Sequence, residues 1–348
     1  LGRVIRKAVK GRTDALAAAW AARSTAYQRF VRSIDAPVTS RAQAESLDLS
    51  ALGSLKGEEL EEAEQLLLRE LEKSSDSRIV DALEFVDSIG AWEGLKAIAV
   101  QAGHPLQAAA AATVAKHQPE SSMSPALRDL LEPNRVAVSG RVRVADALGS
   151  VPGSEADEGL LAAFSDPDEM VRLNALEALF RKHGLDALRR PLPSKANVLA
   201  LALVSPLRAV QRPAIDELRT VLQGLAAGRA AAELGLIYPG PQSSSDRDRF
   251  LDSFHATLGP DSMGEQDYDL VALQRLPAHD RPWIQVMLHA GLAGNSWKAP
   301  DPRAPRAMAA LGWTEFLPAL LEARPDATGE LAQAIDFAIA SLSGRLPH

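Results

Sequence analysis

The stretch SDPDEMVRLNALEALFRKHG at residues 165–184 predicts one buried helix with a marked beginning and end. Asp166 and Pro167 predict the start, because aspartate is a favoured N-cap and proline is tolerated at the first helical position. Gly184 predicts the end, because glycine readily adopts the left-handed conformation that follows a helix. At about 100° per residue, the apolar side chains between them cover more than half of the circumference. Such a helix is typically covered on two sides.

Fragments of this pattern recur along the chain. The anchoring leucines Leu148 and Leu179 are 31 residues apart, and residues 210–218 match residues 171–179 without gaps. Short apolar segments between the copies predict first helices at 92–102, 124–131, 157–164, 196–203 and 315–324. A period of about 31 residues with two helices in each copy predicts an α-solenoid of antiparallel helix pairs, since each pair buries its apolar face on its neighbours.

The string D-P-x-x-x-V-R-x-x-A-x-x-A-L at residues 166–179 resembles the HEAT-like repeat of the type named after phycobilisome lyases. Weaker copies lie at 141–149, 205–218 and 301–312, and the resemblance is absent across about 225–295. It implies an all-α, right-handed solenoid. It also implies a structural ladder between repeats through Asp166 and Arg172, with Arg141 equivalent to Arg172 one repeat earlier. Gln211 stands where that arginine would recur, so the ladder is expected to be interrupted.

Charge and composition divide the chain into segments: a basic N-terminal helical cap or arm at 1–55, HEAT-like repeats at 56–235, an irregular insert or drifted repeat at 236–300, and C-terminal HEAT-like repeats at 301–348. Residues 1–33 carry a net charge of +7, which leaves −14 for the rest of a chain of −7. Trp20 and Phe30 give this segment an apolar side, so we favour a cap over the first repeat. A phosphate- or membrane-binding arm and docking on the acidic body are the alternatives.

Composition excludes several function classes. The chain has no cysteine, which excludes disulfides and thiolate metal sites. No run reaches the roughly 18 apolar residues of a membrane span, so a cytoplasmic protein is expected. The seven histidines form no His-Glu pair or HExxH, and GxxxxGK[ST], GxGxxG and GxSxG are absent. We therefore expect no catalytic residues, cofactor, metal or evident small-molecule substrate.

The expected function is a non-catalytic scaffold or adaptor that binds another protein, because a solenoid presents a long curved surface. The resemblance implies that second helices line its concave side, and aromatic residues are enriched at interface hot spots. The candidate contact residues are Arg143, Asp146, Asn174, Glu177, Arg181, Arg212 and Asp216 on second helices, with Trp283 and Trp297 from the insert. The expected partners include a toxin that this chain neutralises or an assembly that it supports. The composition, rich in Ala and Leu, suggests a bacterial source.

Two alternatives belong to other classes. Some alkylpurine DNA glycosylases resemble this fold, and Asp280-Arg281-Pro282-Trp283 offers the residue types that they use. Phosphate contact demands clustered Lys and Arg, however, and the acidic charge beyond residue 33 argues against nucleic acid. The other alternative is a membrane-associated adaptor that acts through the basic residues 1–33.

Overall fold

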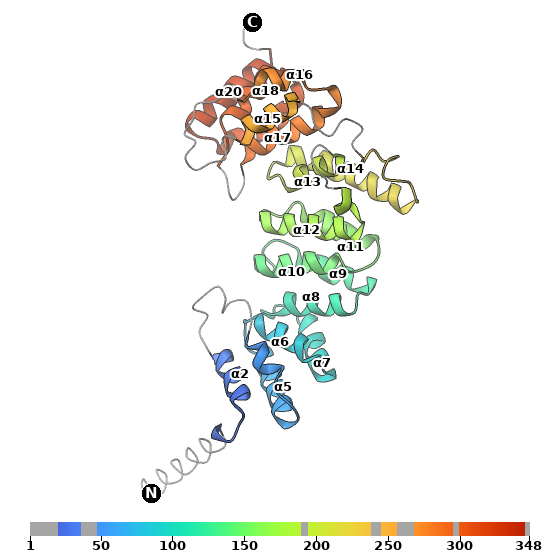
Figure 1. The fold of residues 1–348 in the computed structure, drawn as a ribbon, viewed down its shortest axis with the longest axis vertical. Helices are drawn as coiled ribbons and strands as arrows, with labels where there is room; N and C mark the ends of the chain where they lie inside the picture. The colour runs from blue at the N-terminus through green and yellow to red at the C-terminus, as the bar shows by residue number, and fades with distance from the viewer. Residues whose placement is uncertain are drawn as a thin grey trace. The chain divides into compact units, whose positions relative to one another are not determined.

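The computed structural model describes residues 20–35, 47–188, 194–237, 245–255, 268–294 and 299–344. Within these ranges every regular element is a helix and there is no strand, which confirms the all-α prediction (Figure 1). None of the described helices combines the length and the apolar character that crossing a membrane requires. The chain forms two compact units, Leu1–Gly153 and Ser154–His348. The four-segment division remains a prediction.

The first unit is built from consecutive packed helices. They are α2 (Thr25–Asp35), α4 (Leu49–Leu52), α5 (Glu58–Leu71), α6 (Arg78–Val86), α7 (Ile89–Ala99), α8 (Gln107–His117), the 3-10 helix η1 (Ser121–Met123), α9 (Ser124–Leu130) and α10 (Val138–Leu148). Neighbours in sequence pack as pairs: α5 with α6, α7 with α8, and α9 with α10. The second helices α8 and α10 also pack on each other (Figure 1). Contacts between helices therefore connect each pair with the next.

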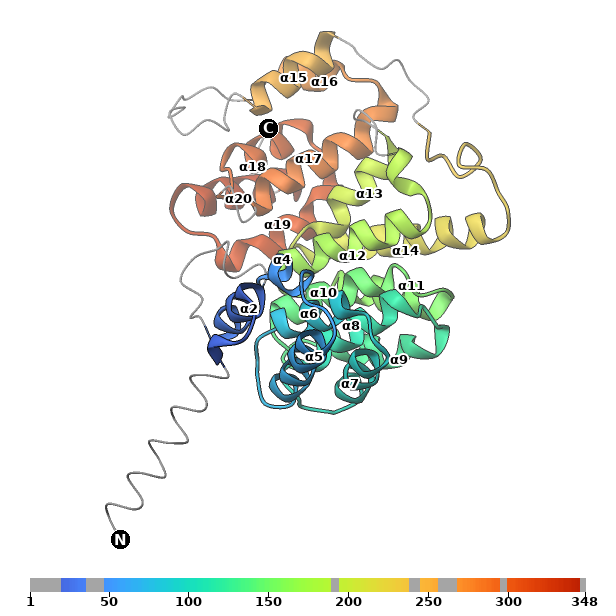
Figure 2. The same cartoon turned by 60° about the horizontal axis from the view of Figure 1, so that its bottom comes forward.

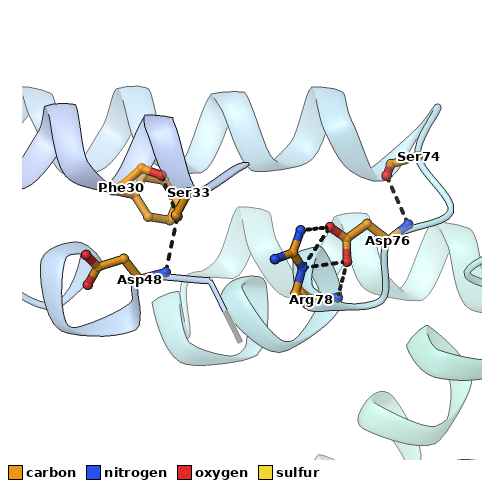
Figure 3. Close-up of polar contacts among 6 residues, drawn as sticks. All are labelled: Phe30, Ser33, Asp48, Ser74, Asp76 and Arg78. Atoms are coloured by element: carbon orange, nitrogen blue, oxygen red, sulfur yellow. Dashed lines mark hydrogen bonds and ion pairs between the residues drawn. The ribbon is translucent and has the colours of Figure 1, made fainter. Parts of the chain in front are cut away.

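Helix α2 joins the core of this unit through Phe30, which is fully buried beside Leu47 and Leu52. The Ser33 hydroxyl donates to the Phe30 carbonyl at 2.6 Å and accepts from the Asp48 backbone N–H at 3.1 Å (Figure 3). These bonds connect the end of α2 to the start of α4.

The basic N-terminal segment meets acidic side chains of α5. Arg23 forms an ion pair with Glu62, and the Ser24 hydroxyl donates to Glu59 at 2.6 Å. The described part of the segment therefore contacts the acidic side chains of α5, while residues 1–19 lie outside the described ranges. Membrane binding through residues 1–33 stays a prediction.

The second unit continues with further helices. They are α11 (Ser154–Ala163), α12 (Glu169–Lys182), α13 (Lys195–Val204), α14 (Arg208–Ala226), α15 (Ser245–His255), α16 (Leu270–Arg275), α17 (Arg281–Ala293), α18 (Arg303–Leu311), α19 (Leu317–Ala323) and α20 (Gly329–Leu342), with the 3-10 helices η2 (Leu185–Leu188), η3 (Ala278–Asp280), η4 (Thr314–Phe316) and η5 (Arg324–Asp326). Helix α13 packs on α12, α14 and α17, while α18 packs on α17 and α20 (Figure 2). The first helices expected at 157–164, 196–203 and 315–324 are confirmed as α11, α13 and α19, with ends that differ by a few residues.

Helix α12 begins at Glu169, two residues later than the sequence predicts. The N-cap is Asp168, whose carboxylate accepts from the Met170 N–H at 2.8 Å. The Asp166 carboxylate accepts from the Asp168 N–H, also at 2.8 Å, and so forms a turn ahead of the helix. Asp166 therefore stabilises the turn ahead of the helix, and Asp168 caps the helix itself. The predicted end is confirmed, because Gly184 follows the helix with a φ of +66°.

The same turn precedes other second helices. In each case a side chain accepts a hydrogen bond from the backbone N–H two residues further on. The acceptors are Asp76 before α6 at 3.0 Å, His104 before α8 at 3.1 Å, Ser205 before α14 at 3.2 Å and Asp301 before α18 at 3.0 Å. Figure 3 shows the Asp76 example, in which Arg78 also binds both carboxylate oxygens. Aspartate, histidine and serine all serve as the acceptor in this turn. The turn is therefore found before helices whose sequences do not share the Asp-Pro pattern of residues 166 and 167.

Candidate partner-binding surface

Three of the predicted contact residues lie on the polar stripe of α12. Glu177 and Arg181 are exposed, whereas Asn174 is half-buried and donates to the Met170 carbonyl at 2.8 Å. Glu177 makes no hydrogen bond or ion pair with any residue in the described ranges. It is therefore a solvated charge available for contact.

Two more predicted residues lie on α14, and both are exposed. Asp216 lies 3.4 Å from Arg219, which in turn contacts Glu158 of α11 at 3.0 Å. Arg212, one turn before Asp216, has no ionic or hydrogen-bonding partner among the described residues. In the gapless alignment of α14 on α12, Arg212 corresponds to the position four residues before Glu177. Residues four apart share a helix face, so the two solvated charges occupy equivalent faces.

The predicted contact residues of α10 are already paired within the first unit. Arg143 is half-buried and donates to both carboxylate oxygens of Asp81 on α6, at 2.7 and 3.1 Å. The hydrogen bond from Asp81 raises the pKa of Arg143, and this effect exceeds the lowering by burial. Asp146 forms an ion pair with Lys116 of α8. These charges connect neighbouring helices, so a partner would have to compete with internal contacts.

Arg172, one of the residues of the predicted ladder, is held by backbone carbonyls. Arg172 is 4% exposed, and its Nη1 donates to the carbonyls of Asp166 and Pro167, both at 2.9 Å. Its Nε donates to the Val204 carbonyl at the end of α13, at 3.0 Å. Burial lowers the pKa of Arg172, although nearby acidic residues partly offset this effect. Arg172 thus connects α12 with the following helix through carbonyl oxygens.

Gln211, at the position where the arginine of the ladder would recur, makes hydrogen bonds of its own. Gln211 is 4% exposed, and its amide nitrogen donates to the carbonyls of Phe164 at 2.9 Å and Leu203 at 3.3 Å. It also donates to the Ser205 carbonyl. Arg141, at the equivalent position of α10, donates to the Val136 carbonyl at 2.8 Å. A neutral amide therefore fills the place of a guanidinium. The signal that could have identified this role in the sequence is a polar residue, Gln211, at a buried position on the apolar face of its helix.

The prediction that Trp283 contacts a partner needs correction. Its side chain is 1% exposed, and it packs edge-on against Phe250 with ring centroids 5.9 Å apart. Tyr268 packs on the other side of this cluster at 6.1 Å from Phe250. An aromatic side chain so placed stabilises the core of α15–α17 and is hidden from solvent. Trp297 lies outside the described residues.

A buried ion pair adjoins this aromatic cluster. Arg247 of α15 is 1% exposed and Asp280 of η3 is fully buried. The Arg247 Nη2 donates to the two carboxylate oxygens of Asp280 at 3.2 and 3.0 Å. Sequence reasoning missed the pair because its members are 33 residues apart and arginine is seldom fully buried. Asp280 is accordingly a core residue, not a surface residue that could reach nucleic acid.

The part of the chain that the structure describes contains no group of three His, Cys, Asp or Glu side chains placed to hold a metal ion. Comparison of the chain with protein-family models, with curated proteins and with solved structures found no match.

Proposed function

We propose that the chain is a non-catalytic scaffold that binds another protein through its second helices, and that its helix pairs form a HEAT-like α-solenoid. In support, the successive helix pairs of the first unit contact one another, and in the second unit α12 packs on α13. The turn that recurs ahead of α6, α8, α12, α14 and α18 supports one repeated building block. Its acceptors His104 and Asp166 are 62 residues apart, which is twice the period in the sequence.

The observation that carries this proposal is the pair of solvated charges Glu177 and Arg212. Most other charges of the predicted surface are engaged inside the chain: Arg143 with Asp81, Asp146 with Lys116, and Asp216 with Arg219. Fixed charges of opposite sign on equivalent helix faces favour a partner that carries the complementary pattern. Such charges chiefly raise the association rate and exclude wrong partners. The partner is then a protein surface with its own separated acidic and basic groups.

The test exchanges these two charges. The tagged full chain is used to capture partners from its native cells, and each captured protein is measured against the variant Glu177→Arg, Arg212→Glu. The control is Glu93→Arg, Lys96→Glu on α7, where both residues are exposed and lie on a first helix. Both double variants leave the net charge of −7 unchanged.

We expect the second-helix variant to associate at least about tenfold more slowly with the cognate partner, with a weaker salt dependence. The control should associate as the native chain does. A partner that binds the native chain and both variants equally would show that this surface is not the binding face. Equal loss in both variants would attribute the effect to charge reversal in general.

A further inference from the structure

A cavity of about 360 Å³ lies inside the second unit, where the start of α12 meets the ends of α13 and α17. Its wall is mostly apolar and includes Leu201, Val204, Ala290, Ala293 and Gly294. This volume falls within the range of small-molecule sites, which are largely apolar with a few convergent polar groups. Its polar lining residues are Glu169, Arg172 and Ser205, and the guanidinium of Arg172 supplies the positive charge among them.

Arg172 has unused hydrogen-bonding capacity at the cavity. A guanidinium carries five N–H donors, of which Nε supplies one and each Nη supplies two. Nε and Nη1 donate to the three backbone carbonyls, whereas Nη2 has no hydrogen bond to any described residue. No carboxylate in the described ranges forms an ion pair with Arg172, although the side chain is 4% exposed. A buried cation of this kind is costly unless an anion compensates it.

The surrounding charges limit which anion can enter. Glu169 lines the cavity and, with Asp166 and Asp168, acts electrostatically on Arg172. The carboxylates of Asp166 and Asp168 accept backbone hydrogen bonds in the turn and at the helix start. Their negative field opposes a doubly charged group such as a phosphate. A ligand with one carboxylate and no other charged group matches the single guanidinium. The apolar wall matches a hydrocarbon body on the same ligand.

We propose that this cavity binds a small monocarboxylate with an apolar tail, with its carboxylate accepting hydrogen bonds from Nη2 of Arg172 and its tail against the wall formed by α13 and α17. Hydrogen bonds to charged groups are stronger than those between neutral groups, so the ligand's charge should dominate its recognition. This site is separate from the proposed protein-binding face, and it needs no partner protein.

Isothermal titration of the full chain with octanoate and with octanamide tests the proposal, because the two probes share a tail and differ in charge. Two variants locate the site. Ala293→Leu narrows the cavity from α17, and Ala340→Leu makes the same change on α20, away from it, at a residue of similar partial exposure. Arg172→Gln removes the charge, and the amide of Gln211 shows that this side chain can serve an equivalent turn.

We expect octanoate to bind with one-to-one stoichiometry, at least about tenfold more tightly than octanamide. Ala293→Leu and Arg172→Gln should each weaken octanoate at least about tenfold, while Ala340→Leu leaves it unchanged. Absence of octanoate binding at millimolar concentration would overturn the proposal. So would equal binding of both probes, or equal loss in the two leucine variants. If Arg172→Gln does not fold, the comparison of Ala293→Leu with Ala340→Leu and of octanoate with octanamide still tests whether the cavity binds a carboxylate. None of these measurements depends on whether the scaffold proposal holds.

Discussion

Neutralising Asp280 should destabilise the second unit far more than neutralising a neighbouring surface carboxylate. Asp280→Asn keeps the shape of the side chain and removes the charge that faces Arg247. Asp280 is 0% exposed and Arg247 is 1% exposed, so water cannot solvate the guanidinium that remains. Breaking a buried pair in this way costs about 3–5 kcal/mol, because a charge in the core loses the carboxylate that compensates it.

The matched control is Glu315→Gln, which breaks an ion pair made by the residue after Asp280. Arg281 Nη2 lies 2.7 Å from the Glu315 carboxylate, and the two side chains are 43% and 54% exposed. Solvent screens such a pair, so the expected cost is at most about 1 kcal/mol. Both variants therefore remove one carboxylate charge from an ion pair that involves one of the adjacent residues Asp280 and Arg281, and they differ in the burial of that pair.

Hydrogen–deuterium exchange of the amides in α15 and α17 measures both costs locally. A loss of 3 kcal/mol corresponds to roughly a hundredfold faster exchange, and 1 kcal/mol to about fivefold. Replacing both partners, with Arg247→Met and Asp280→Leu, should recover much of the protection, because apolar residues of similar volume tolerate this environment. Similar exchange rates in Asp280→Asn and Glu315→Gln would refute the reasoning that burial decides the cost.

Three further changes follow from buried groups. Burial lowers the pKa of His289 from its ordinary value of 6.5 to about 4. As the pH falls from 7 to 5, the imidazole is therefore protonated in the unfolded chain but stays neutral in the folded chain. The free energy of unfolding should fall by about 2 kcal/mol over this range. Urea titrations at both pH values should show this increment disappear in His289→Phe; an equal fall in the variant would assign it elsewhere. Gln211→Leu leaves buried carbonyls without their donor and should cost about 1–3 kcal/mol in urea unfolding, whereas a cost near zero would mean that water replaces the amide. Trp283→Ala should lower the unfolding free energy by about 3–5 kcal/mol, and a merely local loss of partner affinity with unchanged stability would contradict its assignment to the core.

Helix identity could be predicted from the sequence because it depends on local signals. Apolar periodicity and the glycine at residue 184 locate α12 with its end, and the same reasoning finds α11, α13 and α19. The start of α12 was placed too early because Asp166 and Asp168 are both good cap residues. Which of the two caps the helix depends on the turn that precedes it, and composition does not encode that turn.

The surface was harder to predict, because exposure and pairing depend on contacts between distant segments. Arg143 reads as an exposed charge on a helical wheel, yet its partner Asp81 is 62 residues away. Trp283 reads as a hot-spot aromatic, yet Phe250 and Tyr268 cover it after folding. Glu177 was predicted to lie on the surface and is exposed, and no cation of the described residues pairs with it.

Arg172 and Gln211 occupy equivalent positions, so comparing them shows whether the turn requires hydrogen-bond donors alone or also a positive charge. Both side chains are 4% exposed, and both donate to carbonyls around the start of a second helix and the end of a neighbouring first helix. Because the neutral amide of Gln211 does this on α14, the turn needs hydrogen-bond donors and has no need of a charge. The positive charge of Arg172, together with the unused donors of Nη2, exceeds that requirement and lies beside the cavity between α12, α13 and α17. A costly buried charge that the fold does not need is better explained by a ligand than by the stack, and the two-probe titration addresses that difference directly.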